Sequence, residues 1–510
     1  QDTTATKNTG KLIEFLSAES YNIKKIDSVD FLILVGHVKI KQGNTLLFGD
    51  SIIVNTTKNS LEGFGNVHIN DADSVHTYAD YLIYNGNTKK AKLRKHVKLT
   101  DGRGTLTTDS LDYDVSVKIG VYKKGGKLVR NKIILKSTEG VYYGITRDVL
   151  FRNKVSLIDP ENSIFTDTLE YNTYSQLANF ISPSKIISGS RIIKTKNGNY
   201  NLGTKKGYLY ERSSIDDSSY FFIADDMAID DSLGLGEFRG NALYKSKDSL
   251  SFDLIANNIK TNRKKDVLLA TELPILMIKQ PNDTLYVSAD TLYSGRLSDL
   301  TRKIPKARAK EEQLKDSSLN KYFEAFHHVK IYSDSMQGVA DSLFYSLADS
   351  TIRLHNKPIL WVNENQITGD TIYMHLNNKK AEQLRILNNA MAISPVDSTD
   401  YFNQLKGNSI IVDFMDGKIH KMQTKGSAEN IYFTTDDEGK FIGVNQSNAQ
   451  IITIDFNNDE PVKIVFINQL TGKMTPMFDL PKSELKLNNF KWLIDLKPMS
   501  KFDILSPKAN

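Results

Sequence analysis

The sequence predicts an all-β fold: an elongated, solenoid-like repeat β-jellyroll or trough of stacked antiparallel strands, with about 30 residues per repeat. One observation behind this prediction is an octapeptide that recurs at this period, and another is a second strand motif that recurs with it. A third is the alternation of apolar and polar residues inside both motifs, which is typical of strands with one buried face. Helical spacing is not sustained anywhere in the 510 residues.

The octapeptide combines a small residue, Asp, Ser or Thr, an aliphatic residue and often an aromatic one. It reads YADYLIYN at 78–85, FTDTLEYN at 165–172 and VADSLFYS at 339–346. We expect it to turn a corner of each repeat and its Asp to accept backbone N–H groups from the adjoining turn. The Asp of each copy is Asp50, Asp80, Asp109, Asp167, Asp225, Asp290, Asp341 or Asp370.

The second motif is a short strand in which apolar and polar residues alternate: GHVKI, GNVHI, KHVKL, NKVSL and HHVKI, beginning at Gly36, Gly65, Lys95, Asn153 and His327. Each repeat therefore carries at least two strands. Within TTDSLDYD at 107–114, we expect Asp109, Leu111 and Tyr113 to share the face opposite Ser110 and Asp112. The apolar residues of both motifs are predicted to line an inward groove: Val38, Ile40, Val67, Ile69, Leu82, Tyr84, Val97, Leu99, Leu111, Tyr113, Val155, Leu157, Leu169 and Tyr171.

A 30-residue unit with one apolar face cannot bury that face alone, so the copies have to stack with backbone pairing from one unit to the next. Breaks in the period predict the domain organisation. It comprises a lead-in over 1–30, regular repeats over 31–200, more divergent repeats over 201–298, a charged insertion over 299–325, further repeats over 326–404 and a C-terminal β module or cap over 405–510.

Composition limits the classes of function. Lys and Arg exceed Asp and Glu by 66 to 60, a mild excess that suits an anionic partner but does not indicate nucleic acid. The absence of cysteine excludes disulfides and thiolate catalysis. No apolar run is long enough for a membrane-spanning helix, and the polar start at Gln1 is what remains when an export signal or an expression tag has been removed.

No catalytic constellation stands out, and we predict neither a metal site nor a cofactor. Four of the nine histidines, His37, His68, His96 and His328, belong to the recurring strand motif, which accounts for their positions. None has metal-ligand spacing, and there is no nucleophile elbow. The sequence therefore predicts a protein that is not an enzyme.

With the repeats laid out, the chain resembles the OstA-like, or LptA, family of periplasmic lipopolysaccharide-transport proteins. The resemblance rests on GNVHI with YADYLIYN, KHVKL with TTDSLDYD and NKVSL with FTDTLEYN. It covers 31–174 well and 289–376 less closely. It implies a twisted β-jellyroll whose inward residues shield the acyl chains of lipid A, while Lys39, Lys95 and Lys98 are candidates to meet its phosphates.

The resemblance also implies partners and a location. The partners are lipopolysaccharide, further transport proteins joined end to end by β-strand augmentation, and an outer-membrane translocon, with no nucleic acid. The location is the periplasm, after loss of a signal peptide before Gln1, with association with the outer membrane left open. The implied role is to help bridge the inner and outer membranes.

Two other classes of function stay open. One is a structural or docking β-solenoid, a subunit of an outer-membrane complex that binds no lipid because its interior is fully packed. The other is a β-helical enzyme that acts on acidic polysaccharide, which would need a local cluster of Asp with Lys or Arg. A docking solenoid would take up no amphiphile, whereas a lipid conduit would. A polysaccharide-degrading enzyme would lose its activity on a single substitution.

Overall fold

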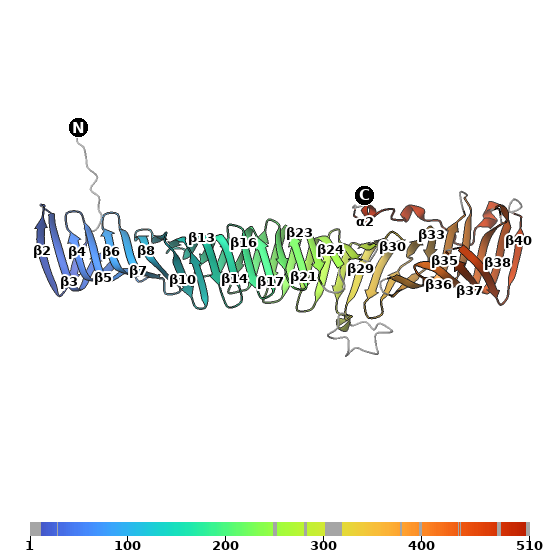
Figure 1. Ribbon diagram of the computed structural model, residues 1–510, viewed down its shortest axis with the longest axis horizontal. Helices are drawn as coiled ribbons and strands as arrows, with labels where there is room; N and C mark the ends of the chain where they lie inside the picture. Colours follow the sequence, from blue (N-terminus) through green and yellow to red (C-terminus); the bar gives the residue numbers. More distant parts are fainter. Residues whose placement is uncertain are drawn as a thin grey trace, which may run out of the picture. The chain divides into compact units, whose positions relative to one another are not determined.

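The computed structural model in Figure 1 describes residues 12–27, 29–247, 252–279, 283–300, 319–377, 380–396, 400–436, 438, 440–458, 460–476 and 481–505. Within these residues forty antiparallel β-strands follow one another, and the helices are short. The all-β class predicted from the sequence is therefore confirmed. Most of the charged insertion predicted at 299–325 falls on 301–318, outside the described residues. No helix in the described part of the chain is long and apolar enough to span a membrane.

The chain divides into two compact units. The N-terminal unit comprises residues 1–218 and 223–232, and the C-terminal unit comprises 219–222 and 233–510. The strands of the N-terminal unit are β1 (Glu14–Ser17), β2 (Ser20–Ile26), β3 (Val29–Gln42), β4 (Thr45–Asn55), β5 (Ser60–Asp71), β6 (Val75–Asn85), β7 (Lys90–Thr100), β8 (Thr105–Asp114), β9 (Ile119–Tyr122), β10 (Gly126–Arg130), β11 (Ile133–Ser137), β12 (Glu139–Tyr143), β13 (Asp148–Ile158), β14 (Ser163–Asn172), β15 (Leu177–Phe180), β16 (Ser184–Ser188), β17 (Arg191–Thr195), β18 (Asn197–Asn201), β19 (Lys206–Tyr210), β20 (Ser213–Asp216) and β22 (Asp226–Asp230). Strand β21 (Tyr220–Ala224) contains residues of both units.

In the N-terminal unit each long strand takes part in two sheets, one through each half. The first half of β14, for example, pairs with β16 and the second half with β15. The two sheets are joined along the line of corners in the middle of the strands, and tight turns lie at both outer margins. We call these margins the first lip (turns 43–44, 72–74, 101–104, 131–132, 159–162 and 189–190) and the second lip (turns 56–59, 86–89, 115–118, 144–147, 173–176, 202–205 and 231–234).

At several corners two consecutive residues have positive φ, and they insert a bulge into the strand and redirect it. In β5 they are Gly65 (φ 68°) and Asn66 (φ 45°), and the pairing with β6 shifts register at this point. Lys95 and His96 do the same in β7. These pairs are the first two residues of the GHVKI-type motif. The expectation that the octapeptide turns the corner is therefore corrected: it crosses the corner as an extended strand.

The octapeptide Asp lies on the outside of the corner and contacts a side chain of the neighbouring strand. The Asp80 carboxylate is 2.7 Å from Nδ1 of His96, and Asp50 accepts a hydrogen bond of 2.9 Å from Nδ2 of Asn66. The expectation that these carboxylates accept backbone N–H groups of a turn is wrong for both residues. The reason is that the positive-φ pair places its own polar side chains within reach of the carboxylate.

Asp109 also departs from the expected pattern. Leu111 and Tyr113 are buried, whereas Asp109 is exposed and does not share their face. The corner adds a residue to the alternation, so that the buried positions on its two sides, Leu106 and Leu111, are five residues apart. A strict period of two therefore fails at each corner and holds on either side of it.

The C-terminal unit contains a second run of antiparallel strands that is closed by its own C-terminal segment. Its strands are β23 (Leu235–Ser246), β24 (Phe252–Asn262), β25 (Val267–Thr271), β26 (Ile275–Lys279), β27 (Thr284–Ser288), β28 (Thr291–Gly295), β29 (Tyr322–Tyr332), β30 (Met336–Ser346), β31 (Thr351–His355), β32 (Ile359–Val362), β33 (Asn365–Thr368), β34 (Thr371–Asn377), β35 (Lys380–Pro395), β36 (Phe402–Met415), β37 (Lys418–Thr435), β38 (Phe441–Asn457), β39 (Glu460–Ile467) and β40 (Thr471–Thr475). The helical turns are η1 (Leu297–Asp299), η4 (Lys482–Leu485), η5 (Ile494–Leu496) and α2 (Lys501–Leu505).

Residues 481–505 form what we call the C-terminal strap, which runs back over the strands of this unit so that α2 packs against β27 and β29 (Figure 1). Two buried glutamines hold its backbone. Gln404 donates from Nε2 to the Leu485 carbonyl at 2.9 Å and accepts from the Leu487 N–H at 2.8 Å. Gln366 makes the equivalent pair of bonds to residues 491 and 493, both 2.7 Å. A side-chain amide bonded twice in this way replaces a strand partner for the strap.

Candidate functional site

The inward positions of the N-terminal unit form a continuous apolar interior between its two sheets. Every residue predicted to line the groove is buried, with an exposed fraction between 0 and 2%: Val38, Ile40, Val67, Ile69, Leu82, Tyr84, Val97, Leu99, Leu111, Tyr113, Val155, Leu157, Leu169 and Tyr171. Side chains from both halves of the long strands thus meet in one core. In this conformation the core is packed, so an acyl chain would have to part the sheets to enter.

A ladder of tyrosines runs along this interior at intervals of 29 residues: Tyr84, Tyr113, Tyr142, Tyr171 and Tyr200. Each lies close to the end of a strand at the second lip, with its ring buried. Burial raises the pKa of the Tyr84 and Tyr113 hydroxyls, and the Asp71 carboxylate raises it further. The ladder marks the boundary between the apolar interior and the polar lips.

The two lips meet along a seam of polar contacts. The Tyr84 hydroxyl donates to Oε1 of Gln42 at 2.5 Å, and Nε2 of Gln42 donates to the Gly86 carbonyl at 2.8 Å. Further along the seam, the Tyr113 hydroxyl donates to Asp71 at 3.1 Å. Other contacts across the seam are Lys118 to Ser74 (2.5 Å), Thr173 to Asp101 (2.9 Å) and Lys205 to Glu161 (2.6 Å). The interior is therefore closed by individually weak polar contacts and not by a backbone ladder.

Two arginines of the first lip differ in their partners. Arg191 forms a two-bond ion pair with Asp231 of the second lip, with N–O distances of 2.6 and 2.7 Å. Arg130 is equally buried, but its Nη1 has no hydrogen-bond partner among the described residues. The same holds for the hydroxyls of Tyr142 and Tyr171. The seam therefore contains unsatisfied polar groups as well as closed contacts.

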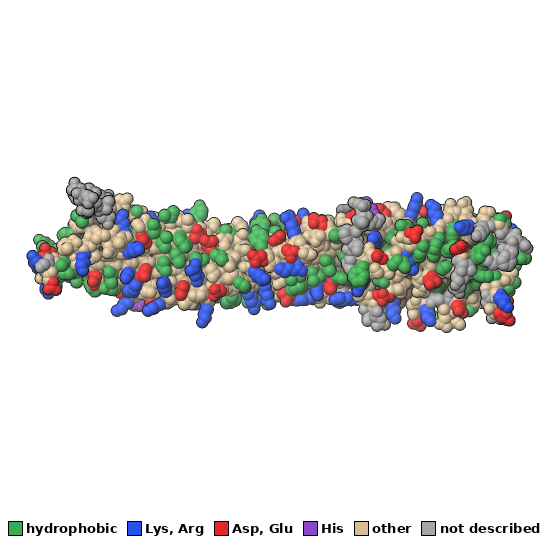
Figure 2. Space-filling model, turned by 90° about the horizontal axis from the view of Figure 1, so that it is seen from above, with side chains coloured by type: hydrophobic (Ala, Val, Ile, Leu, Met, Phe, Trp, Pro, Cys, Tyr) green, Lys and Arg blue, Asp and Glu red, His purple; other side chains and the backbone are tan. Residues whose placement is uncertain are grey.

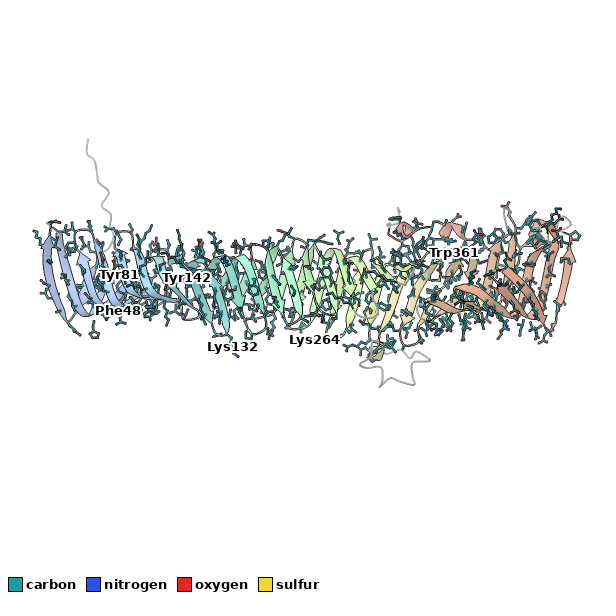
Figure 3. All side chains as sticks on the ribbon, in the orientation of Figure 1. Phe48, Tyr81, Lys132, Tyr142, Lys264 and Trp361 are labelled. Carbon is teal, nitrogen blue, oxygen red and sulfur yellow. The ribbon has the colours of Figure 1, made fainter. Side chains whose placement is uncertain are left out.

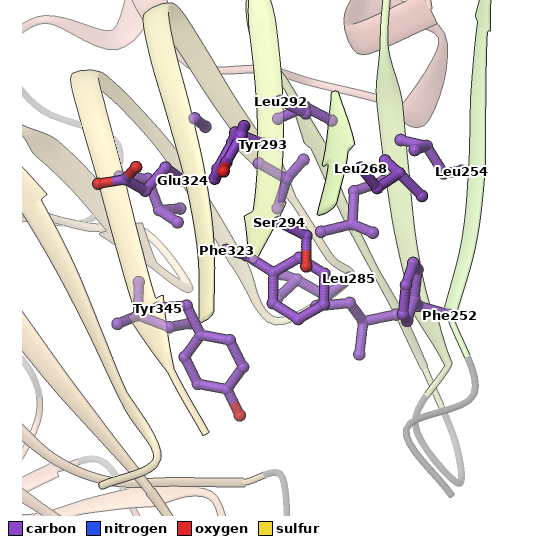
Figure 4. Close-up of a pocket in the computed structure, with 16 residues that line it drawn as sticks. Phe252, Leu254, Leu268, Leu285, Leu292, Tyr293, Ser294, Phe323, Glu324 and Tyr345 are labelled. Carbon is purple, nitrogen blue, oxygen red and sulfur yellow. The ribbon is translucent and has the colours of Figure 1, made fainter. Parts of the chain in front are cut away.

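The interior of the C-terminal unit holds small cavities. One of about 30 Å³ lies among Leu254, Leu268, Leu285, Phe323 and other apolar side chains (Figure 4) and has room for one or two water molecules. Another of about 140 Å³ is lined by isoleucines and leucines together with Asn403, Gln404 and Asn430. Gln404 therefore lines this cavity and also bonds to the C-terminal strap.

The outer faces carry mixed charge. Figure 2 shows basic, acidic and apolar side chains interspersed over the face seen from above, with lysines and arginines projecting along one edge. Of the lysines considered for phosphate binding, Lys39 lies over the Phe48 ring and Lys98 over the Tyr78 ring, at 5.7 and 5.6 Å from the centroids. Lys95 lies at a corner. All three are away from the seam. No group of three or more metal-ligating side chains is found in the described residues.

Sequence reasoning missed Tyr142, Tyr200 and Arg130. The first two could have been found, because they continue the 29-residue spacing set by Tyr84, Tyr113 and Tyr171. The place of Arg130 at the seam depends on how the two lips meet, and no local pattern reports that.

The fold and its interior define a repeat β-protein with an apolar core between two lips. Residues 11–164 and 152–225 match the family model described as OstA-like protein. The two matches together cover residues 11–225, so this part of the chain is similar to OstA-like proteins. A similar solved structure is that of LptH, the LptA-homologous periplasmic component of the lipopolysaccharide transport device from Pseudomonas aeruginosa. It shares 12% identity over 32% of this chain and 80% of its own, and its TM-score of 0.15 is too low for a comparison in detail. No curated protein matches.

Proposed function

We propose that this chain is a periplasmic lipopolysaccharide-transport protein that takes lipid A acyl chains into the interior of its N-terminal unit and helps to bridge the inner and outer membranes. It is not an enzyme in this proposal. The observation that carries it is the unbroken apolar interior within the OstA-like region, with the same inward positions filled at every repeat. Because the inward positions are equivalent along the interior, an acyl chain can move from one to the next without meeting a position that binds it much more tightly than the others.

The energetics favour opening of the seam by a lipid. An acyl chain of about 14 carbons gains roughly 10 kcal/mol on leaving water, at about 0.8 kcal/mol per methylene. A typical contact of the seam contributes only about 0.5–1.5 kcal/mol net, and less where it is exposed. The side chains displaced from the core would remain in contact with the acyl chain. The gain therefore exceeds the cost of parting the few contacts that one chain spans.

The free edge at the start of the N-terminal unit supports the proposed partners. Within the described residues, β2 pairs only with β3, and its other edge is open. Tyr21 and Ile23 on this strand are 67% and 64% exposed. An open edge with exposed apolar side chains suits β-strand augmentation by another transport protein. An outer-membrane translocon is the partner proposed for delivery.

A docking solenoid without lipid is the second candidate, and the packed core of the N-terminal unit favours it. The two functions differ in one measurement. The purified chain is mixed with lipopolysaccharide and, separately, with the polysaccharide released from it by removal of the acylated part. A lipid conduit binds lipopolysaccharide and does not bind the released polysaccharide. A chain that binds neither is a docking protein, and equal binding of both would place recognition on the sugars.

A further inference from the structure

Arg130 at the first lip of the N-terminal unit is a buried cation without a counterion. It is the last residue of β10, only 8% of its surface is exposed, and no ion pair of Arg130 is found among the described residues. Arg191 occupies a similar place at the same lip and is neutralised by Asp231. The contrast shows that Arg191 has an ion-pair partner, whereas none is found for Arg130 in the part of the chain that the structure describes.

A buried guanidinium keeps its proton, so the cost of removing it from water has to be offset by an anion or by several acceptors. The nearby carboxylate of Asp159 is already bonded within its own turn, to the N–H groups of residues 161 and 162 and to the Asn162 side chain. Arg130 therefore retains donor capacity, because its buried Nη1 has no hydrogen-bond partner among the described residues.

The Tyr171 hydroxyl adds a second unused group at this place. Tyr171 is 0% exposed, and within the described residues its hydroxyl has no hydrogen bond of normal geometry. Burial raises its pKa, and the neighbouring Arg130 opposes that rise, so the two groups are close enough to interact. Lys132, two residues beyond Arg130, is exposed and projects from the margin of the ribbon in Figure 3. The site thus combines a guanidinium fork with a hydroxyl donor, and the exposed Lys132 lies outside it.

We propose that Arg130 and Tyr171 form an anion site at the seam that takes a phosphate group on the headgroup of an acylated amphiphile. This proposal rests on the proposed function and adds a binding site for the headgroup. The acyl chains lie in the core beneath the tyrosine ladder, and the phosphate binds at Arg130. A guanidinium presents paired donors that match phosphate oxygens, and a tyrosine hydroxyl supplies one more. The phosphate oxygens would accept from the Arg130 and Tyr171 groups that lack partners among the described residues.

The test compares lipid A with lipid A from which the phosphates have been removed, each titrated against the full chain. The wild-type chain is expected to bind the phosphorylated form about tenfold more tightly or better, the range for charge-assisted hydrogen bonds. Arg130→Met removes that preference, and Tyr171→Phe reduces it several-fold. Lys132→Met, which removes an exposed charge from the same turn, keeps it. The proposal is overturned if Arg130→Met retains the full preference or if the wild-type chain has none.

Thermal unfolding separates a binding role from a structural one. Removal of a buried cation without a partner leaves the melting temperature of Arg130→Met unchanged or raises it, and a clear fall would overturn the proposal. The same unfolding measurement is repeated with inorganic phosphate in place of the amphiphile. If it stabilises the wild-type chain but not Arg130→Met, and the phosphorylated amphiphile is not preferred, the site is for a free anion and the headgroup assignment fails. If neither amphiphile binds, the proposed function fails, whereas the phosphate arm still reports on the anion site.

Discussion

The Thr173 hydroxyl donates a hydrogen bond of 2.9 Å to the Asp101 carboxylate, across the seam between turns that are 72 residues apart. This contact shows how near the lips approach each other. At the same place, a Cβ added to Gly104 would lie 3.6 Å from Cγ2 of Thr173. A cysteine sulfur takes the γ position at residue 173, so the two positions are close enough for an engineered disulfide. Because the chain contains no cysteine, a disulfide placed here would be unique.

We therefore predict that the double variant Gly104→Cys, Thr173→Cys locks the seam when oxidised. The oxidised protein should melt at a higher temperature and should take up lipopolysaccharide far more slowly than the reduced protein, because the lips cannot part at this point. Uptake is measured before and after reduction of the same sample, with each single variant as a control. Equal uptake by the two forms would show that lipid does not enter through this part of the seam.

The Arg191–Asp231 pair predicts a stability effect opposite to that of Arg130. Replacement of Arg191 by Met removes the cation from the largely buried Asp231 carboxylate, which also accepts a hydrogen bond of 3.1 Å from the Tyr200 hydroxyl. The free energy of unfolding should fall by about 3 kcal/mol or more. The double variant Arg191→Met, Asp231→Leu should recover most of that loss, because no charge is left behind. Denaturant unfolding of the three proteins measures both effects, and a single variant as stable as the wild type would contradict the account.

We predict that the contacts of Asp101 stabilise the folded chain near neutral pH and that this stabilisation is lost in acid. Burial acts to raise its pKa, but the N–H groups of Gly104 and Arg103 and the Thr173 hydroxyl outweigh burial, so the pKa in the folded chain is lowered. A lowered folded-state pKa gives stability that is present above the unfolded pKa, near 4, and is lost as the pH falls through the folded value. Melting curves of the wild type and Asp101→Asn from about pH 6 to pH 2 should converge as the pH falls. Curves that stay parallel would rule out this contribution.

The C-terminal strap should loosen when Gln404 is replaced by Leu. The variant loses both bonds to the strap backbone and leaves the Leu487 N–H without its acceptor, at a cost of about 1–3 kcal/mol. Amide hydrogen exchange at Leu487 should accelerate roughly tenfold or more, while exchange in the N-terminal unit stays the same. Gln42→Leu, a similar change at a lip of the N-terminal unit, is the control. No change at Leu487 would show that packing alone holds the strap.

Features that depend on the local repeat could be predicted from the sequence, namely the strands and the side chains that face the interior. The alternation within each motif places Leu111 and Tyr113 inside, and both are fully buried. The pattern failed at Asp109 because β8 crosses the corner there, opposite the positive-φ pair Lys95–His96 of β7. Gly and Asn at several corners signal this conformation, but the Lys95–His96 corner carries neither and gives no such signal.

Long-range features could not be predicted in this way. The seam joins residues some 40 to 70 positions apart, such as Tyr113 with Asp71 and Thr173 with Asp101. Which polar groups meet there depends on how the two sheets close. The strap presents the same difficulty, since Gln404 finds its partners 81 and 83 residues further on. The predicted domain boundaries and the lipid-binding role of the inward residues stay predictions.

The presence of acyl chains in the core of the N-terminal unit is tested most directly by photocrosslinking. A diazirine analogue of leucine is placed at Leu111, which is fully buried, or at Ile83, which is 39% exposed on the outer face. Each protein is loaded with lipopolysaccharide and irradiated. The account predicts a covalent adduct through the acyl chains at position 111 and little at position 83. Equal labelling at the two positions, or no adduct at position 111 in a protein that still binds the lipid, would contradict it.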